Sequence, residues 1–384
     1  MNKRLFWVFA LSSVVYFNQG IENLPAQGLF YYLKETLAFS PEKIMLLGSI
    51  TTLAWLVKPI IGYIIDNFLT KRAWILIAIT FDIILAFFIG LFSLPIILIV
   101  TILMINSTNA AFRDVSVDGI MCVEGKANNA TGKIQSVQWI SISLAGLING
   151  ILGGYIAHKW DYKIGFLFLI PFYLVVVFTA LFYKDEVRDK GSYGQRSLSA
   201  DLKRIFTDKR LLIIALFIFL YRYSPSFGTP LFFIQRDVFK WSKIWIGSLT
   251  SIAMVFQILG ALIYYRFSQR INIKKWLYIS VFLGAVITLS YLHYTPFTAV
   301  FYDVVYSFIG MFVFIMVMDF MARNTVKGFE ATSFAFLCSV SNLALVASNL
   351  SGAVLFPVIG LKWLIVISAF ASFLCLALIH KIDL

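Results

Sequence analysis

One arginine and two aspartates occupy a stretch that is otherwise apolar enough to lie in a lipid bilayer. The segment NAAFRDVSVDGIMCVE, residues 109–124, contains Arg113, Asp114 and Asp118. A charge at the bilayer centre costs about 2.5 to 3.5 kcal/mol on insertion scales, so each such residue is a hypothesis about function. Asp114 and Asp118 are four residues apart and share one helix face, whereas Arg113 lies about 100° round from Asp114. This chemistry suits proton coupling or an ion-pair gate.

A lysine reaches a comparable depth in another apolar segment, WLVKPIIG, residues 55–62. Lys58 stands there beside Pro59, which loosens the helix at that turn. Two bases and two acids at one depth can neutralise one another. One interpretation is a buried salt-bridge network that locks this part of the protein. The other makes an acid here a ligand for substrate or for a proton, and a gate that rearranges would combine both roles.

The first apolar segment carries polar residues at its middle, in YFNQGIENLPAQG, residues 16–28. Gln19, Glu22 and Asn23 lie at mid-depth, and Gly20 and Pro25 weaken the helix around them. Irregular backbone at the midplane is tolerated only where it lines a cavity or is buried in protein. We therefore expect these three side chains to bind substrate. A hydrogen bond between helices is the alternative role for Glu22.

A basic residue occupies the corresponding depth in the second half of the chain, in LYRYSPSFG, residues 220–228. Arg222 opposite Glu22 would suit a ligand that bears both a donor-rich ring and an anionic group. An ion pair between the two residues in the empty protein is the alternative. Tyr223 and Trp139 lie at depths where they could stack on a flat ring, although packing in the core explains such aromatics equally well.

Three further acids lie within predicted membrane spans. Asp319 mirrors Asp118 in the second half and is a candidate for coupling or gating. Asp82 and Asp303 have no evident partner in the sequence, so we expect them to be locally paired or to reach towards the membrane surface.

Helices of membrane length must position these residues. Of the 384 residues, 60% are hydrophobic and 13% are charged, about half the charge of a soluble domain. Apolar runs divide the chain into about twelve spans, each long enough to cross the hydrocarbon core. The predicted spans are 5–33, 43–65, 73–92, 95–122, 133–158, 164–183, 211–235, 244–267, 276–292, 296–322, 331–356 and 361–380.

The net charge of +13 could indicate a nucleic-acid partner in a soluble protein. Here Lys and Arg concentrate in alternate loops, so the charge indicates the orientation of the chain in the membrane. The positive-inside rule places both termini in the cytoplasm of a multi-pass protein of the inner (plasma) membrane. The longest polar break, residues 184–210, is a cytoplasmic linker. It separates an N-terminal six-helix bundle, residues 1–183, from a C-terminal six-helix bundle, residues 211–384.

The two halves match each other at an offset of about 202 residues, as duplicated bundles do. LFYYLKETLAFS (29–40) falls on LFFIQRDVFKWS (231–242), and Trp74 falls on Trp276. The sequence GYIIDNFLTKR contains the GxxxDxxxxKR signature of the major facilitator superfamily, in which Asp66 would gate. We therefore predict an all-α integral membrane protein with twelve transmembrane helices in two six-helix halves, the major facilitator fold.

The sequence offers no set of residues for enzymatic or metal chemistry. The three cysteines are isolated, the three histidines lie at span ends, and neither HExxH nor GxSxG occurs. We expect no enzyme activity, no cofactor, no metal and no nucleic-acid partner. The expected partners are a small molecule, protons and the lipid bilayer, and the expected state is a monomer.

Several ordered motifs in residues 16–154 resemble the folate-biopterin transporter family of the major facilitator superfamily. They are YFNQG, LKE before SP, WLVKPIIG, the acids of RDVSVDGIMCVE, and GKIQSVQW. The matching residues are Gln19, Gly20, Lys34, Glu35, Trp55, Lys58, Pro59, Asp114, Asp118, Glu124, Gln135, Ser136 and Trp139.

This resemblance implies uptake of a pterin or a folate, driven by protons, with the acids of spans 1 and 4 near substrate or proton. Another organic anion is the wider expectation for the small-molecule partner. Gly119 stands where the family prefers alanine, and the C-terminal half matches only in its general plan. A permease of the muropeptide or acetyl-coenzyme A type is the alternative, since those carriers also have a DxxxDG or DxxxDA turn in span 4.

Overall fold

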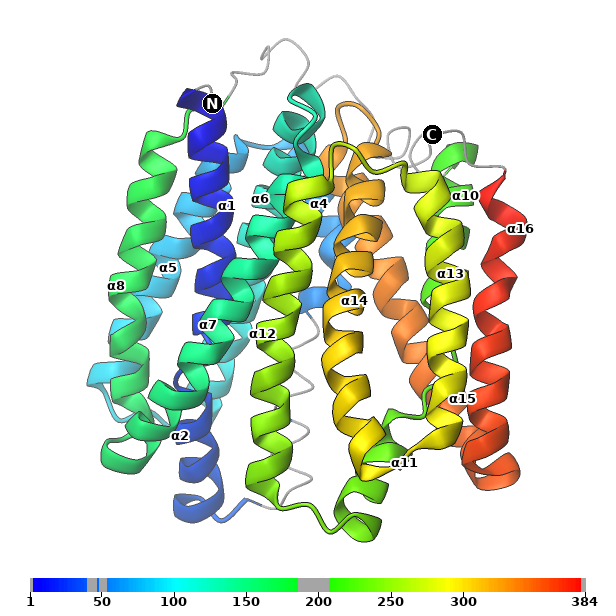
Figure 1. The fold of residues 1–384 in the computed structure, drawn as a ribbon. Coiled ribbons are helices and arrows are strands. Elements are labelled where there is room, and N and C mark those ends of the chain that lie inside the picture. The colour runs from blue at the N-terminus through cyan, green and yellow to red at the C-terminus, as the bar shows by residue number, and fades with distance from the viewer. Residues whose placement is uncertain (1–2, 40–46, 48–53, 186–206, 381–384) are drawn as a thin grey trace. The chain divides into compact units, whose positions relative to one another are not determined.

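The computed structural model describes residues 3–39, 47, 54–185 and 207–380, and every regular element among them is a helix (Figure 1). The chain forms two compact units. Unit 1 comprises Met1–Arg196 and Thr325–Ala335, and unit 2 comprises Ser197–Asn324 and Phe336–Leu384. The sequence assigned residues 325–335 to the C-terminal bundle, whereas their contacts place them in unit 1.

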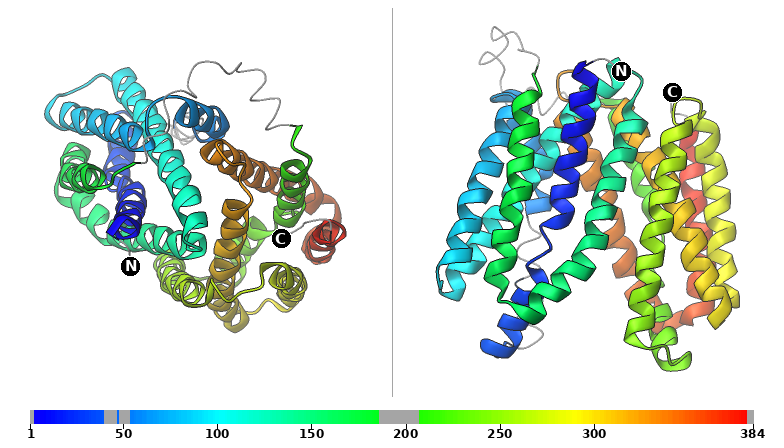
Figure 2. Two further views of the ribbon diagram at one scale, coloured as in Figure 1. Left: turned by 90° about the horizontal axis from the view of Figure 1, so that it is seen from above. Right: turned by 60° about the vertical axis from the view of Figure 1, so that its left-hand side comes forward.

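Unit 1 is built around α1, which packs against α6, α7 and α8, while α5 packs against α6 and α8. Figure 2 (right) shows α1, in dark blue, between α7 and α8. The helices of unit 1 are α1 (Lys3–Ile21), α2 (Ala26–Tyr31), the π-helix η1 (Tyr32–Thr36), α4 (Lys58–Asn67), α5 (Lys71–Leu91), α6 (Ile96–Ala127), α7 (Thr131–Lys159) and α8 (Tyr162–Phe182).

Unit 2 has the same kinds of element, and α12 packs along α14. Its helices are α10 (Lys209–Arg222), α11 (Gly228–Phe233), the π-helix η3 (Ile234–Val238), α12 (Lys243–Phe267), α13 (Ile273–Ser290), η4 (Tyr291–His293), α14 (Pro296–Arg323), α15 (Glu330–Ala371), η5 (Ser372–Cys375) and α16 (Leu376–Ile379).

The longest helix, α15, contains the break expected between the last two spans. Gly360 has φ 72° and ψ 172° inside it, a conformation that glycine adopts readily because it has no Cβ. The first turns of α15, up to Ala335, pack in unit 1 against Ile61, Ile65 and Val115.

The first span is broken as Gly20 and Pro25 predicted. Helix α1 ends at Ile21, a turn follows, and α2 begins at Ala26. A side chain at Gly20 would bring its Cβ within 2.6 Å of the Ala145 Cβ on α7, so only glycine permits this close approach. The amide of Asn149 donates to the Gly20 carbonyl at 2.5 Å, which satisfies a backbone acceptor freed by the break.

The break recurs in unit 2 at the offset of 202 residues. The chain leaves α10 at Arg222 and enters α11 at Gly228, and a π-helix follows α11 as one follows α2. The corresponding landmarks are Ala26 and Gly228 at the helix starts, Tyr32 and Ile234 at the π-helix starts, and Ala38 and Lys240 at positive φ (49° and 56°).

The same register continues into the next spans. Thr70 caps α5, and Asn272, 202 residues later, caps α13; each side chain accepts the N–H of the residue three positions on. Trp74 then stacks on Phe112 with ring centroids 5.0 Å apart, and Trp276 contacts Phe312 at 5.4 Å. The duplication predicted from the sequence is therefore present in the helix boundaries and in the packing.

Seven helices among the described residues are long and apolar enough to cross a membrane. Large apolar side chains on α5, such as Phe81, Ile84 and Leu91, are exposed, as they are where a helix faces lipid. The predicted span 43–65 lies mostly outside the described residues, apart from Leu47 and its last part, and so does most of the predicted linker. Each of the other predicted spans coincides with described helix, broken in spans 1 and 7.

Candidate functional site

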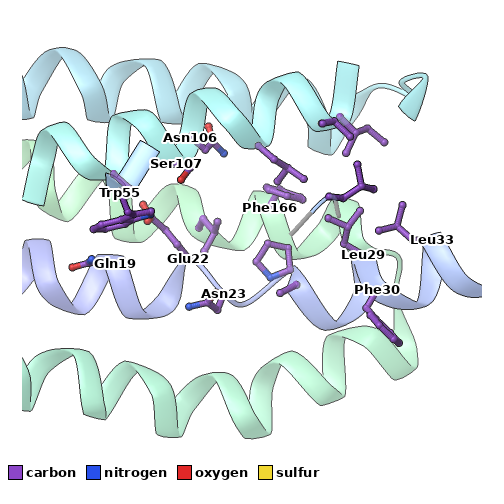
Figure 3. A pocket seen from close by; sticks show the side chains of 18 of the residues that line it. Gln19, Glu22, Asn23, Leu29, Phe30, Leu33, Trp55, Asn106, Ser107 and Phe166 are labelled. Atoms are coloured by element: carbon purple, nitrogen blue, oxygen red, sulfur yellow. The ribbon is translucent and has the colours of Figure 1, made fainter. Parts of the chain in front are cut away.

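A cavity of about 580 Å³ lies in unit 1 beside the break in the first span. Figure 3 shows several of its side chains, with polar groups gathered near the break and apolar groups towards α2. The lining residues are Gln19, Glu22, Asn23, Pro25, Ala26, Leu29, Phe30, Leu33, Leu47, Trp55, Ile96, Ile99, Val100, Leu103, Asn106, Ser107, Ala110, Ile142, Phe166, Leu169 and Tyr173.

The three residues predicted on span 1 all line this cavity. Glu22 and Asn23 lie in the turn after α1, and Gln19 lies in its last turn (Figure 3). The side-chain oxygen of Gln19 is buried and has no hydrogen-bond partner in the described part of the chain. Because a buried amide without a partner is unfavourable, this oxygen is available to a ligand.

Arg113 is shared by two carboxylates. Its guanidinium forms ion pairs with Glu22 and with Asp82 on α5. The amide of Asn109, one turn earlier on α6, donates to the other oxygen of Asp82 at 2.7 Å. The guanidinium also lies 5.8 Å from the ring centroid of Tyr173. Arg113 thus joins the cavity to a buried acid for which the sequence offered no partner.

Asp114 forms its ion pair with Lys58 and not with its neighbour Arg113. The Lys58 ammonium lies 2.6 Å from the Asp114 carboxylate, and both side chains are buried. The same ammonium lies 4.4 Å from the ring centroid of Trp55, a residue of the cavity wall. The helix is interrupted at Val57, directly before Lys58, as expected for the turn ahead of Pro59.

Asp118 is buried and has no ion pair among the described residues. Its carboxylate accepts hydrogen bonds from the Tyr16 hydroxyl at 2.9 Å and from the Gln138 amide at 3.2 Å. Trp139 contacts Tyr16 edge-on, with ring centroids 6.2 Å apart, and is not among the residues that line the cavity. The two acids of the RDVSVDG stretch therefore have different direct partners.

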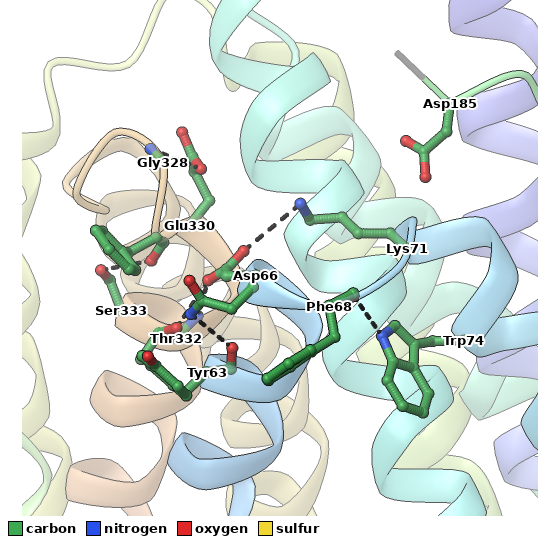
Figure 4. Close-up of polar contacts among 12 residues, drawn as sticks. Tyr63, Asp66, Phe68, Lys71, Trp74, Asp185, Gly328, Glu330, Thr332 and Ser333 are labelled. Carbon is green, nitrogen blue, oxygen red and sulfur yellow. Dashed lines mark hydrogen bonds and ion pairs between the residues drawn. The ribbon is translucent and has the colours of Figure 1, made fainter. Parts of the chain in front are cut away.

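Asp66 holds the start of α15 (Figure 4). Its carboxylate accepts the backbone N–H and the hydroxyl of Thr332, each at 2.8 Å, and pairs with Lys71 at 3.5 Å. Nearby, Glu330 accepts the N–H of Gly328 at 3.0 Å and lies 3.9 Å from the ammonium of Lys126. The contacts of Asp66 and Lys126 join the ends of α4 and α6 to residues 325–335 within unit 1.

The predicted residues of unit 2 lie in local contacts of their own. Arg222 ends α10, and its guanidinium lies 5.6 Å from the ring centroid of Phe314. Tyr223 stacks on Phe219, with centroids 6.0 Å apart and planes at 5°. Asp319 accepts from the hydroxyl of Tyr264 at 2.7 Å and pairs with Arg323 at 2.8 Å.

Some cavity residues were missed by the sequence reasoning. Asn106 and Ser107 line the cavity, and Asn109 supports Asp82. A signal was available, because Asn106, Asn109 and Arg113 follow one another at spacings of three and four residues in MINSTNAAFRD and so share a face of α6. Asp82 lies on another helix, and only the fold brings it to this face.

The fold and the buried charges define the class of protein. The fold is that of the major facilitator superfamily transporters: FucP in its outward conformation, the fucose:proton symporter of E. coli, aligns with a TM-score of 0.73 over 98% of both chains at 12% identity. The human organic anion transporter MFSD10 aligns with a TM-score of 0.69 over 98% of this chain and 99% of its own, at 15% identity. The chain thus has the fold of these proteins, and seven of its described helices are long and apolar enough to cross a membrane.

The particular family follows from the sequence model of the BT1 family, which matches residues 19–383. The chain belongs to this family. It is 23% identical to the folate-biopterin transporter of Synechocystis over 91% of this chain and 74% of that protein. It is 25% identical to folate transporter 1 of Plasmodium falciparum, over 90% of this chain and 72% of that protein. The family indicated by the sequence motifs is confirmed.

Proposed function

We propose that this protein is a secondary active transporter that moves a pterin or folate-like molecule across the membrane by alternating access, coupled to protons. The observation that carries the proposal is the cavity at the break of span 1, where the carboxylate of Glu22 lies among aromatic side chains. The names of two relatives, a folate-biopterin transporter and a folate transporter, support the substrate class.

The cavity has the chemistry that a pterin ring requires. The amino and amide edge of the ring presents N–H donors, which a carboxylate accepts in strong, charge-assisted hydrogen bonds. Glu22 supplies that acceptor, and the side chains of Trp55, Phe166 and Tyr173 supply flat surfaces against which a ring can pack. A volume of about 580 Å³ is within the usual range for a small-molecule site.

The coupling site in this proposal is Asp118. It is a buried carboxylate held by hydrogen bonds from Tyr16 and Gln138 without an ion pair in the described chain. Binding a proton would remove a buried charge there without leaving a base unpaired. Two further contacts serve as gates in this proposal: the ion pair of Lys58 with Asp114, and the hydrogen bonds of Asp66 to Thr332. Asp319 has the corresponding role in unit 2.

Orientation and further substrate contacts complete the proposal. The distribution of Lys and Arg supports an orientation in the inner (plasma) membrane with both termini in the cytoplasm, and the protein is proposed to act as a monomer. Arg222, Tyr223 and Trp139 are proposed to contact the substrate at another stage of the cycle, with Arg222 receiving an anionic group.

Counterflow in proteoliposomes tests this function. Vesicles preloaded with unlabelled biopterin or folate should accumulate the labelled compound, whereas vesicles preloaded with an anhydromuropeptide should not. Net uptake should require a proton gradient and should fall when an ionophore is added. Counterflow with the muropeptide alone would establish the alternative permease function, and absence of counterflow with every compound would refute transport of this class.

A further inference from the structure

We propose that Asp82 is a positioning residue for the cavity: it keeps Arg113 neutralised when a ligand takes the carboxylate of Glu22. This inference rests on the proposed function, because it requires a ligand that binds Glu22. It assigns a role in binding to an acid that does not line the cavity.

The two carboxylates that share Arg113 are not equivalent. Asp82 has no solvent exposure and its second oxygen is held by Asn109 at 2.7 Å. The Glu22 side chain is 20% exposed and lines the cavity. Asp82 is therefore the fixed partner of Arg113, and Glu22 is the partner that an entering molecule can reach.

Arg113 cannot be left alone in this position. Its side chain is only 3% exposed, and a buried charge that loses its partner is strongly unfavourable. Among the described residues its ion partners are Glu22 and Asp82, because Asp114 pairs with Lys58. Without Asp82, a ligand that drew Glu22 away would leave the guanidinium unpaired.

Asp82 removes this conflict. When the N–H donors of a ligand bind Glu22, the guanidinium keeps the Asp82 carboxylate and stays in place beside the Tyr173 ring. Because Arg113 keeps its ion pair with Asp82, Glu22 can bind the ligand without leaving the guanidinium unpaired. An Asp82→Asn variant would tie Glu22 to Arg113 and force the ligand to compete with that pair.

Calorimetric binding of biopterin to the purified full-length protein tests the proposal, with uptake in proteoliposomes as a second readout. Asp82→Asn should weaken binding at least tenfold and raise the half-saturating concentration for uptake, with the maximal rate within twofold of wild type. The double variant Asp82→Asn with Arg113→Gln should bind within threefold of wild type, because nothing then competes for Glu22. A purely structural role of Asp82 predicts no such rescue.

A matched control keeps Asp82 and its contacts. Asp303→Asn removes an acid of α14 in unit 2 and should bind within threefold of wild type. If Asp82→Asn does not fold, the double variant decides alone, since a tenfold loss of affinity in it would overturn the proposal.

The outcomes separate this inference from the function beneath it. If wild type binds biopterin and Asp82→Asn binds it with the same affinity, the role of Asp82 is overturned and the proposed function stands. The same holds if the double variant binds as weakly as Asp82→Asn. Failure of the wild type to bind either biopterin or folate overturns the proposed function and this inference together.

Discussion

Replacing Lys58 by methionine should destabilise the protein strongly, because the change leaves the Asp114 carboxylate buried without its partner. The two charged groups are 2.6 Å apart, and their side chains are 11% and 5% exposed. Removal of one member of a buried pair costs about 3 to 5 kcal/mol, whereas exposed pairs contribute about 0 to 1 kcal/mol. The low exposure of both side chains places the Lys58–Asp114 pair among the buried pairs.

The converse replacement removes the acid of the pair and keeps the base. Asp114→Leu alone leaves a buried ammonium and should be destabilising by somewhat less, because the ring of Trp55 at 4.4 Å offsets part of the loss. The double variant Lys58→Met with Asp114→Leu leaves no buried charge and should lie within about 1 kcal/mol of wild type. The coupling energy of the pair is then about 3 kcal/mol or more.

Reversible unfolding in mixed micelles with an increasing fraction of sodium dodecyl sulfate, followed by circular dichroism, measures these free energies. Wild type, both single variants and the double variant form the cycle, and Glu35→Gln is the control for loss of one exposed charge. The assignment of this pair as a buried structural unit would be refuted if each single variant lowered the free energy of unfolding by less than about 1 kcal/mol. It would also be refuted if the effects of the two single variants simply summed to that of the double variant.

Three further changes test other contacts. Asp118→Asn should abolish proton-driven accumulation of substrate while counterflow persists, and loss of both activities would show that Asp118 does more than carry a proton. Asp66→Ala removes both hydrogen bonds to Thr332 and should cost about 1 to 3 kcal/mol; faster amide exchange confined to residues 325–335 is the expected signature, and unchanged exchange would contradict it. Gly20→Val should lower the thermal midpoint, because its Cβ would lie 2.6 Å from that of Ala145, and an unchanged midpoint would mean that α1 and α7 can separate freely.

Features of the fold that depend on local sequence could be predicted. Gly20 and Pro25 marked the break in span 1 because both residues weaken a helix. The duplication was visible as a constant offset, and it reappears in helix starts, caps and π-helices at the same 202-residue spacing. Buried charge, which is costly in a membrane, likewise marked Lys58 as a member of an ion-pair network and Glu22 as a residue that lines a cavity.

The partners themselves could not be predicted. The sequence grouped Arg113, Lys58, Asp114 and Asp118 by depth, yet depth does not determine which helix face meets which neighbour. Arg113 pairs with Glu22 and Asp82, whereas Lys58 pairs with Asp114. Such pairings depend on helix packing, and they decide which acid remains without a base.

Glu22 in the cavity of unit 1 is proposed to bind the substrate, and the affinity of biopterin for wild type and for Glu22→Gln is the measurement that decides this role. Asp82 still neutralises Arg113 in that variant, so its thermal midpoint should match that of wild type. Biopterin should bind at least tenfold more weakly to Glu22→Gln than to wild type, and its affinity for Glu35→Gln should be unchanged. Equal affinity of Glu22→Gln and wild type would contradict this role.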